Sequence, residues 1–256
     1  MSQDSPFTRY SPFILPAAGA LGIGLAWWAL TVGGNVPPYL LPTPDAVGSR
    51  LVSNPGLYLE HAGYTLERIL LGGGIGVLLG LVVGIVVRFV SLARTVAMPY
   101  IITIRVVPKI AIAPLLLIYF GTGGGTALLL VALIAFFPMV INTVAGLKRA
   151  PERHRELLAS VDARPVYVFY ALYLPYAVPD VFAGLKQSMT LAVVGAIVAE
   201  WIIVDNGLGH IILLGSESLQ ADLMIAALFV LLALGLAVYG VIVVVQRRLV
   251  WTNPVA

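Results

Sequence analysis

Residues 65–87 read TLERILLGGGIGVLLGLVVGIVV, and this stretch indicates the class of structure to which the chain belongs. From Ile69 to Val87 it contains no charged side chain. A helix of roughly 20 apolar residues crosses the hydrocarbon core of a bilayer. The stretch therefore predicts a membrane-spanning helix.

The composition of the whole chain agrees with that prediction. Of its 256 residues 60% are hydrophobic and only 11% are charged, and the mean hydropathy is +0.99. Soluble domains carry about 45–50% apolar and about 25% charged residues. These values exclude an ordinary soluble enzyme, a disordered chain and a nucleic-acid-binding module. The absence of cysteine excludes disulfides and thiolate metal sites.

Apolar runs predict an all-α, polytopic membrane helical bundle with six transmembrane helices. The spans are expected near residues 13–31, 65–87, 98–120, 126–147, 181–203 and 223–245. The first run is longer than the apolar core of a signal peptide, so it is interpreted as a retained span. Residues 1–63 are expected to form this span and an outer loop, in which an LPTP turn precedes an amphipathic interfacial helix. Residues 64–248 are expected to form a core of five spans.

The basic residues orient these spans. Arg88 and Arg94 follow the second span, five cations follow the fourth, and Arg247 and Arg248 follow the sixth. Lysine and arginine are enriched in cytoplasmic loops. The pattern therefore predicts a multi-pass protein of the cell membrane with both termini and the polar loop 148–180 in the cytoplasm.

Four glycines lie four residues apart in the second span, at Gly72, Gly76, Gly80 and Gly84. On a helix they form a flat ridge that lets another backbone approach closely. The ridge is compatible with helix packing inside one bundle and with an interface between subunits.

Two cations lie deep in the third span, Arg105 and Lys109, near Pro108 and Pro114. A charge at membrane depth costs about 2.5–3.5 kcal/mol on insertion scales, and prolines free backbone carbonyls that can line a cavity. These four residues are candidates for lining a polar cavity inside the membrane. The alternative is that the two cations extend to the cytoplasmic interface or form structural pairs.

Glu200 lies late in the fifth span and is a candidate for the path or an outer gate, or is solvated at the interface. The histidines His61, His154 and His210 are scattered and have no partner at metal-ligand spacing. No catalytic constellation and no metal site is therefore predicted, and the chain is not expected to be an enzyme.

The inner loop predicts a helix from Pro151, a break over residues 162–165 and a second helix to Leu172, after which Leu174 and Pro175 return the chain to the membrane. Its apolar stripe comprises Leu157, Leu158 and Val161. The stripe suits docking of a soluble partner, or packing on the chain's own bundle.

This loop resembles the EAA loop of ABC-type importer permeases: Glu-Ala-Ala, three residues, Gly, nine residues, Ile-x-Leu-Pro. The spacing places residues 156–162 on the first part of this pattern and residues 172–175 on the second, and Glu156, Leu174 and Pro175 match it in identity. Leu157 and Leu158 stand where the pattern has alanines. Asp162 departs from the usual glycine. Residues 105–123 (RVVPKIAIAPLLLIYFGTG), 136–147 (FFPMVINTVAGL) and 179–201 (PDVFAGLKQSMTLAVVGAIVAEW) resemble the nitrate/sulfonate/taurine branch.

The resemblance implies a type I importer permease in the prokaryotic cytoplasmic membrane. Two copies, surrounded by membrane lipid, would form the path, each EAA-like loop would dock on a cytoplasmic ATPase, and an extracytoplasmic solute-binding protein would deliver solute. ATP and Mg²⁺ would bind to the ATPase and no cofactor to this chain. The implied solute is a small anion (nitrate, a sulfonate, taurine) or a vitamin precursor. The alternatives are an ion-gradient-driven secondary transporter, whose inverted repeats are not evident here, and a membrane scaffold or intramembrane enzyme.

Overall fold

A computed structural model of the chain describes residues 6–34, 36–104 and 107–249. Within these ranges the chain is helical and contains no strand. It divides into two compact units, one within residues 1–58 and 211–229, the other within residues 59–210 and 230–256. The predicted all-α membrane fold is confirmed. The segment 211–229, expected in the core, belongs instead to the first unit.

Among the described residues, five helical segments are long and apolar enough to cross a membrane. They lie within α1 (Pro6–Gly33), α3 (Pro55–Phe89), α6 (Gly124–Leu147), the continuous helical segment Pro165–Ile202 and α11 (Ala221–Leu249). In α6 the observed bounds differ from the prediction by two residues at most, whereas α3 begins ten residues earlier than expected.

The expected third span, residues 98–120, is not one helix. It is divided between α4 (Ser91–Ile104), the short 3-10 helix η1 (Lys109–Ile112) and α5 (Ala113–Phe120). Pro108 lies at the N-cap of η1 in an extended conformation, and Pro114 occupies the first turn of α5. Both prolines lack the N–H that a continuous helix needs, so they separate two helices and begin new ones.

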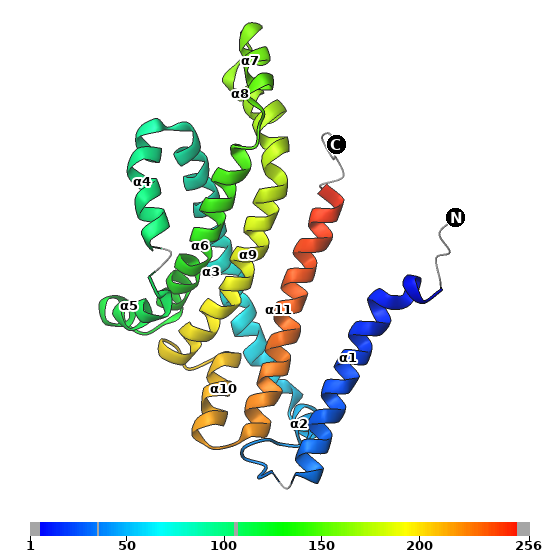
Figure 1. Ribbon diagram of the computed structural model, residues 1–256. Coiled ribbons are helices and arrows are strands. Elements are labelled where there is room, and N and C mark those ends of the chain that lie inside the picture. Colours follow the sequence, from blue (N-terminus) through cyan, green and yellow to red (C-terminus); the bar gives the residue numbers. More distant parts are fainter. Residues whose placement is uncertain (1–5, 35, 105–106, 250–256) are drawn as a thin grey trace. The chain divides into compact units, whose positions relative to one another are not determined.

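The larger unit is built around α3, α6 and α9 (Leu174–Ile202), and α6 and α9 pack together and lie side by side in Figure 1. Its central cluster combines Ile69 and Val131 with Ala135, Ala192 and Ala196, all buried. Alanines let the helix backbones approach closely. The van der Waals contacts that result help to hold membrane helices together.

The glycine ridge of α3 packs against α6 of the same chain. Cβ atoms added at Gly72, Gly80 and Gly84 would lie 2.8, 2.6 and 2.7 Å from atoms of α6, and one at Gly76 would overlap the Ala132 carbonyl oxygen. All four positions thus serve helix packing within one chain.

Gly76→Ala is therefore expected to lower the free energy of unfolding by about 1–3 kcal/mol, because the added methyl group must displace a backbone carbonyl of α6. Gly74→Ala is the matched control, since a Cβ there meets no atom within 4 Å. Thermal unfolding of both variants in detergent measures the difference. Equal unfolding temperatures would contradict the tight α3–α6 contact.

In the smaller unit the LPTP turn begins a helix as expected. The Thr43 side chain caps α2 (Pro44–Ser53) by accepting the Ala46 N–H at 3.3 Å. The expected interfacial stretch 45–64 is divided between α2 and the beginning of α3. Arg50 ties α2 to the beginning of α11, through a hydrogen bond to Gln220 just before it (2.6 Å) and an ion pair with Asp222 in its first turn (3.6 Å).

Candidate functional site

The polar inner loop forms the helix α7 (Glu152–Ser160), which ends in a Schellman motif. The Ala163 N–H donates to the Leu158 carbonyl (3.0 Å) and the Asp162 N–H to the Ala159 carbonyl (3.1 Å). Asp162 has φ 49°, so it adopts the left-handed conformation for which glycine is usual. Aspartate is one of the few residues that tolerate it. The departure from glycine therefore leaves the turn intact.

The chain does not turn back at Leu174 and Pro175, so that expectation is wrong. The helix α8 (Pro165–Val168), the π-helical turn η2 (Phe169–Tyr173) and α9 follow one another without a break. The Leu174 N–H donates to the carbonyl of Phe169, five residues back. This wider turn accommodates Pro175, which has no N–H to donate, so the helix continues.

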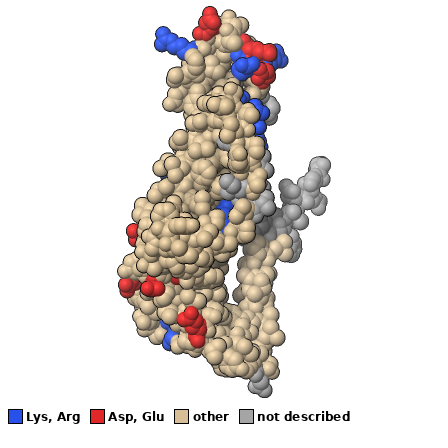
Figure 2. Space-filling model, turned by 90° about the vertical axis from the view of Figure 1, so that its left-hand side faces the viewer, with Lys and Arg blue, Asp and Glu red and all other residues tan. Residues whose placement is uncertain are grey.

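The tip of the loop presents apolar side chains to the outside. Leu157 is 63% and Val161 68% exposed, and Leu158 is half-buried. Figure 2 shows charged side chains gathered at the end of the molecule where α7 lies, beside a largely uncharged bundle surface. On α7 itself, the hydrogen bond from Arg155 lowers the pKa of Glu152. An exposed apolar patch rimmed by charges is typical of a protein–protein contact.

The base of this loop is fixed to the bundle by charged contacts. Arg149 forms an ion pair with Asp180 of α9 at 2.8 Å. Arg88, at the end of α3, lies 5.4 Å from the ring centre of Tyr173, a cation–π distance. Phe89 also packs edge-on against Tyr173, with ring centres 5.0 Å apart. These contacts link the segments on either side of α7 to the ends of α3 and α9.

A polar pocket lies where η1, α6 and α9 meet. It has a volume of about 380 Å³, and its polar lining residues are Lys109, Asn142 and Gln187. The Lys109 ammonium lies 5.4 Å from the ring centre of Phe137. The Asn142 amide donates to the Pro138 carbonyl (2.8 Å) and to Gln187 Oε1 (3.2 Å). The pocket thus joins a cation to two amides within otherwise apolar helices.

The other described path candidates do not line this pocket. Pro108 and Pro114 shape the break that carries Lys109, and Arg105 lies outside the described residues. Glu200 is not among the residues that line the polar pocket. The structure thus brings Lys109 together with two residues of other helices and separates it from Glu200.

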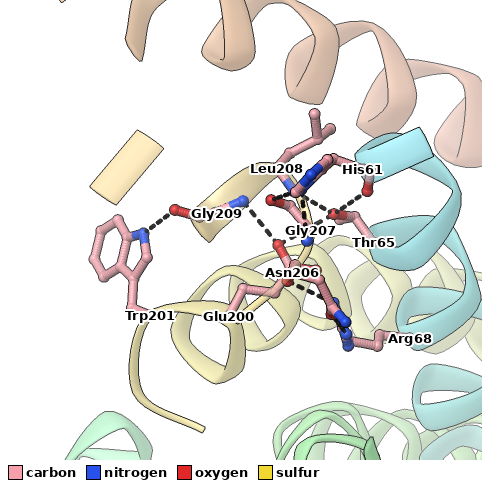
Figure 3. A network of polar contacts seen from close by, with 9 residues as sticks. All are labelled: His61, Thr65, Arg68, Glu200, Trp201, Asn206, Gly207, Leu208 and Gly209. Atoms are coloured by element: carbon pink, nitrogen blue, oxygen red, sulfur yellow. Dashed lines mark hydrogen bonds and ion pairs between the residues drawn. The ribbon is translucent and has the colours of Figure 1, made fainter. Parts of the chain in front are cut away.

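Glu200 is the centre of a buried network near the end of α9, shown in Figure 3. Its side chain is 0% exposed, so the interpretation that it is solvated at the interface is wrong. Arg68 Nη1 of α3 lies 2.7 Å from Glu200 Oε1. The other oxygen, Oε2, accepts the Gly209 N–H (2.8 Å) and lies 3.1 Å from the Thr65 hydroxyl. Both carboxylate oxygens are therefore satisfied inside the chain.

The loop after α9 completes this network. Arg68 Nη1 donates to the Asn206 carbonyl at 3.1 Å, and its other terminal nitrogen contacts the Asn206 side chain. Gly207 has φ 105°, and a Cβ there would overlap the Glu200 carboxylate. Glycine is required at this position by both the backbone conformation and the space. The network fixes α3, α9 and the loop to one another.

Sequence reasoning did not select Arg68, Asn142 or Gln187 as site residues. Each lies inside a helix that is long and apolar enough to cross a membrane. Charged and amide side chains in such helices face protein or water and mark functional or pairing positions. That signal was available in the sequence, but it does not say which residues meet.

Comparisons with known proteins agree with this geometry. Residues 76–251 match the family model described as "Binding-protein-dependent transport system inner membrane component". A probable ABC transporter permease protein of Haemophilus influenzae is 31% identical over 228 residues, which is 89% of this chain and 93% of that protein. The taurine transport system permease protein TauC of Escherichia coli is 28% identical, over 90% of this chain and 87% of that protein.

A solved structure has the same fold. An inward-facing MetNI methionine ABC transporter aligns with a TM-score of 0.67 and 19% identity, covering 77% of this chain and 97% of that one.

Proposed function

Because this chain belongs to the family of binding-protein-dependent transport system inner membrane components, we propose that it forms the solute path of an ATP-driven importer and couples that path to a separate ATPase. It is a multi-pass membrane protein and a permease subunit of an ABC importer, not an enzyme.

The observation that carries the proposal is the exposed apolar stripe on α7. Leu157 and Val161 project from a helix whose base is fixed to α3 and α9 through Arg88 and Arg149. A stripe of this kind fits an apolar groove on a soluble ATPase, to which ATP and Mg²⁺ would bind. The clustered cations support a cytoplasmic location for α7 and for both termini.

The remaining partners complete the importer. A second copy of the chain would form the other half of the path, and an extracytoplasmic binding protein would deliver solute at the opposite end. Movement of the ATPase would shift α7 and, through its anchors, the ends of α3 and α9. Rigid-body rearrangements of this kind switch a transporter between two discrete states.

Reconstitution in liposomes with the candidate ATPase and binding protein tests the proposal. Uptake is expected to require ATP and to persist when proton and sodium gradients are dissipated. Uptake that follows an imposed ion gradient without ATP would instead support the secondary transporter.

The polar pocket favours a small anion as the solute. The Lys109 ammonium supplies positive charge and the Gln187 amide supplies N–H donors, which suit sulfonate, nitrate or carboxylate oxygens. Relatives named for taurine, aliphatic sulfonates and nitrate support this class, whereas relatives named for formylaminopyrimidine and riboflavin represent the alternative.

Lys109→Gln is expected to reduce uptake of taurine, used as the probe anion, by about tenfold, the equivalent of roughly 1.4 kcal/mol. The physical reason is the loss of the positive charge in the pocket. Lys186→Gln is the matched control, since Lys186 lies next to Gln187 on α9 but does not line the pocket. Equal taurine uptake by both variants would contradict the anion assignment. The assignment would also be contradicted if the chain carried riboflavin and not taurine, with riboflavin uptake unchanged in both variants.

A further inference from the structure

A second polar cavity lies at the C-terminal end of α3, near the base of the inner loop. It has a volume of about 640 Å³ and is formed where α3 ends, α4 begins and α6 ends. Its charged lining residues are Arg88, Arg94 and Lys148, and the hydroxyl-bearing Ser91 and Thr95 lie beside them. The cavity therefore combines three cations with two hydroxyl groups.

No carboxylate lines this cavity among the residues the structure describes. The ion pairs between described residues involve other arginines, and Glu152, the carboxylate that interacts with the charge of Arg88, is hydrogen-bonded to Arg155. Three like charges lining one cavity repel one another, and an anion bound between them would relieve that repulsion. The charge pattern thus points to an anionic ligand.

The two faces of α4 show what kind of anion fits. Ser91, Thr95 and Pro99 line the cavity at intervals of four residues. Leu92, Val96 and Tyr100, one position further along, are 72%, 53% and 65% exposed. The helix therefore has a polar face toward the cavity and an apolar stripe along its outside. A ligand that meets both has an anionic head and an apolar tail.

We propose that this cavity binds the phosphate group of an anionic phospholipid, whose acyl chains lie along the apolar stripe of α4. Arg88 directly follows the apolar run of α3, which places the cavity at the level of the lipid headgroups. Basic pockets at the cytoplasmic ends of membrane helices are suited to anionic headgroups. The exposed stripe distinguishes a lipid from free phosphate, which would contact the cations alone.

The experiment measures phospholipid binding to the purified full chain in detergent, by native mass spectrometry and by the shift of the thermal unfolding temperature. The probes are phosphatidylglycerol, phosphatidylcholine and inorganic phosphate. The test variant is Arg94→Gln with Lys148→Gln, because both side chains are exposed and their loss does not disturb the core. Arg88 is kept, since its stacking on Tyr173 is part of the packing.

Phosphatidylglycerol is expected to bind in preference to the other two probes, and the double variant to lose about 30-fold in affinity for it, as two cations near a membrane surface imply. The control, Arg247→Gln with Arg248→Gln, removes the same charge from the end of α11 and is expected to change affinity by less than about threefold. Equal losses in both variants would show non-specific attraction and overturn the proposal. Equal binding of phosphatidylcholine would overturn it, as would phosphate binding that matches phosphatidylglycerol.

Discussion

Replacing Glu200 by alanine is expected to lower the free energy of unfolding by about 3–5 kcal/mol, the range measured when one partner of a buried ion pair is removed. Arg68 would keep its charge in a site that is only 6% exposed, with its carboxylate partner gone. The Gly209 N–H would also lose its acceptor. The loss therefore combines an unpaired charge with an unpaired buried donor.

The measurement is the thermal unfolding of purified variants in detergent, followed by circular dichroism. Glu67→Ala is the matched control, because Glu67 precedes Arg68 in α3 but its side chain is exposed. It is expected to change stability by no more than about 0.5 kcal/mol.

A double-mutant cycle with Arg68→Ala isolates the pair. Once Arg68 is absent, removing Glu200 should cost less than it does alone, with a coupling energy of about 0.5–3 kcal/mol. Strict additivity of the two substitutions would show that the two charges do not stabilise each other and that Glu200 acts through another contact.

Leu157→Asp is expected to abolish ATP-driven uptake, or to reduce it by more than about tenfold, and to leave the permease folded. Leu157 is 63% exposed, so its replacement removes little buried surface within the chain. At a docked interface the aspartate would be desolvated against apolar groups, and losing a central interface contact costs about 2–4 kcal/mol. Binding of the ATPase, ATP hydrolysis and uptake are measured on the same reconstituted samples.

Leu219→Asp provides the control for this prediction. Leu219 is also an exposed leucine, at 68%, and it lies in the turn between α10 (Leu208–Glu217) and α11, far from α7 in the sequence. Its φ of 55° is a conformation that aspartate accepts more readily than leucine does. ATPase binding should be unchanged in this variant. Normal binding and uptake in Leu157→Asp would contradict the coupling role of α7.

Local features of the sequence were enough to predict the long helices and the inner loop. A chain in lipid must satisfy its backbone hydrogen bonds within each segment, so an apolar run such as that of α6 is helical wherever it packs. The helix α7 and its break depend on Pro151 and on the turn at Asp162, which are also local. For this reason the hydropathy of the chain alone indicated a polytopic helical membrane protein.

Other features depended on how separate segments meet. The wider turn that carries the helix through Pro175 arises from a hydrogen bond between Leu174 and Phe169, which no pattern of proline spacing specifies. The break before η1 divided residues 98–120, which were expected to form one span, because Pro108 cannot continue a helix.

The tertiary structure alone showed which polar residues are partners. Arg68 and Glu200 are 132 positions apart, and Asn142 and Gln187 are 45 apart. Hydropathy shows that each of these side chains needs a partner or a cavity, because an unpaired polar group in lipid is costly. Which partner it meets follows from the registers at which α3, α6 and α9 pack, and those registers are set by glycine and alanine contacts between helices that are far apart in the sequence.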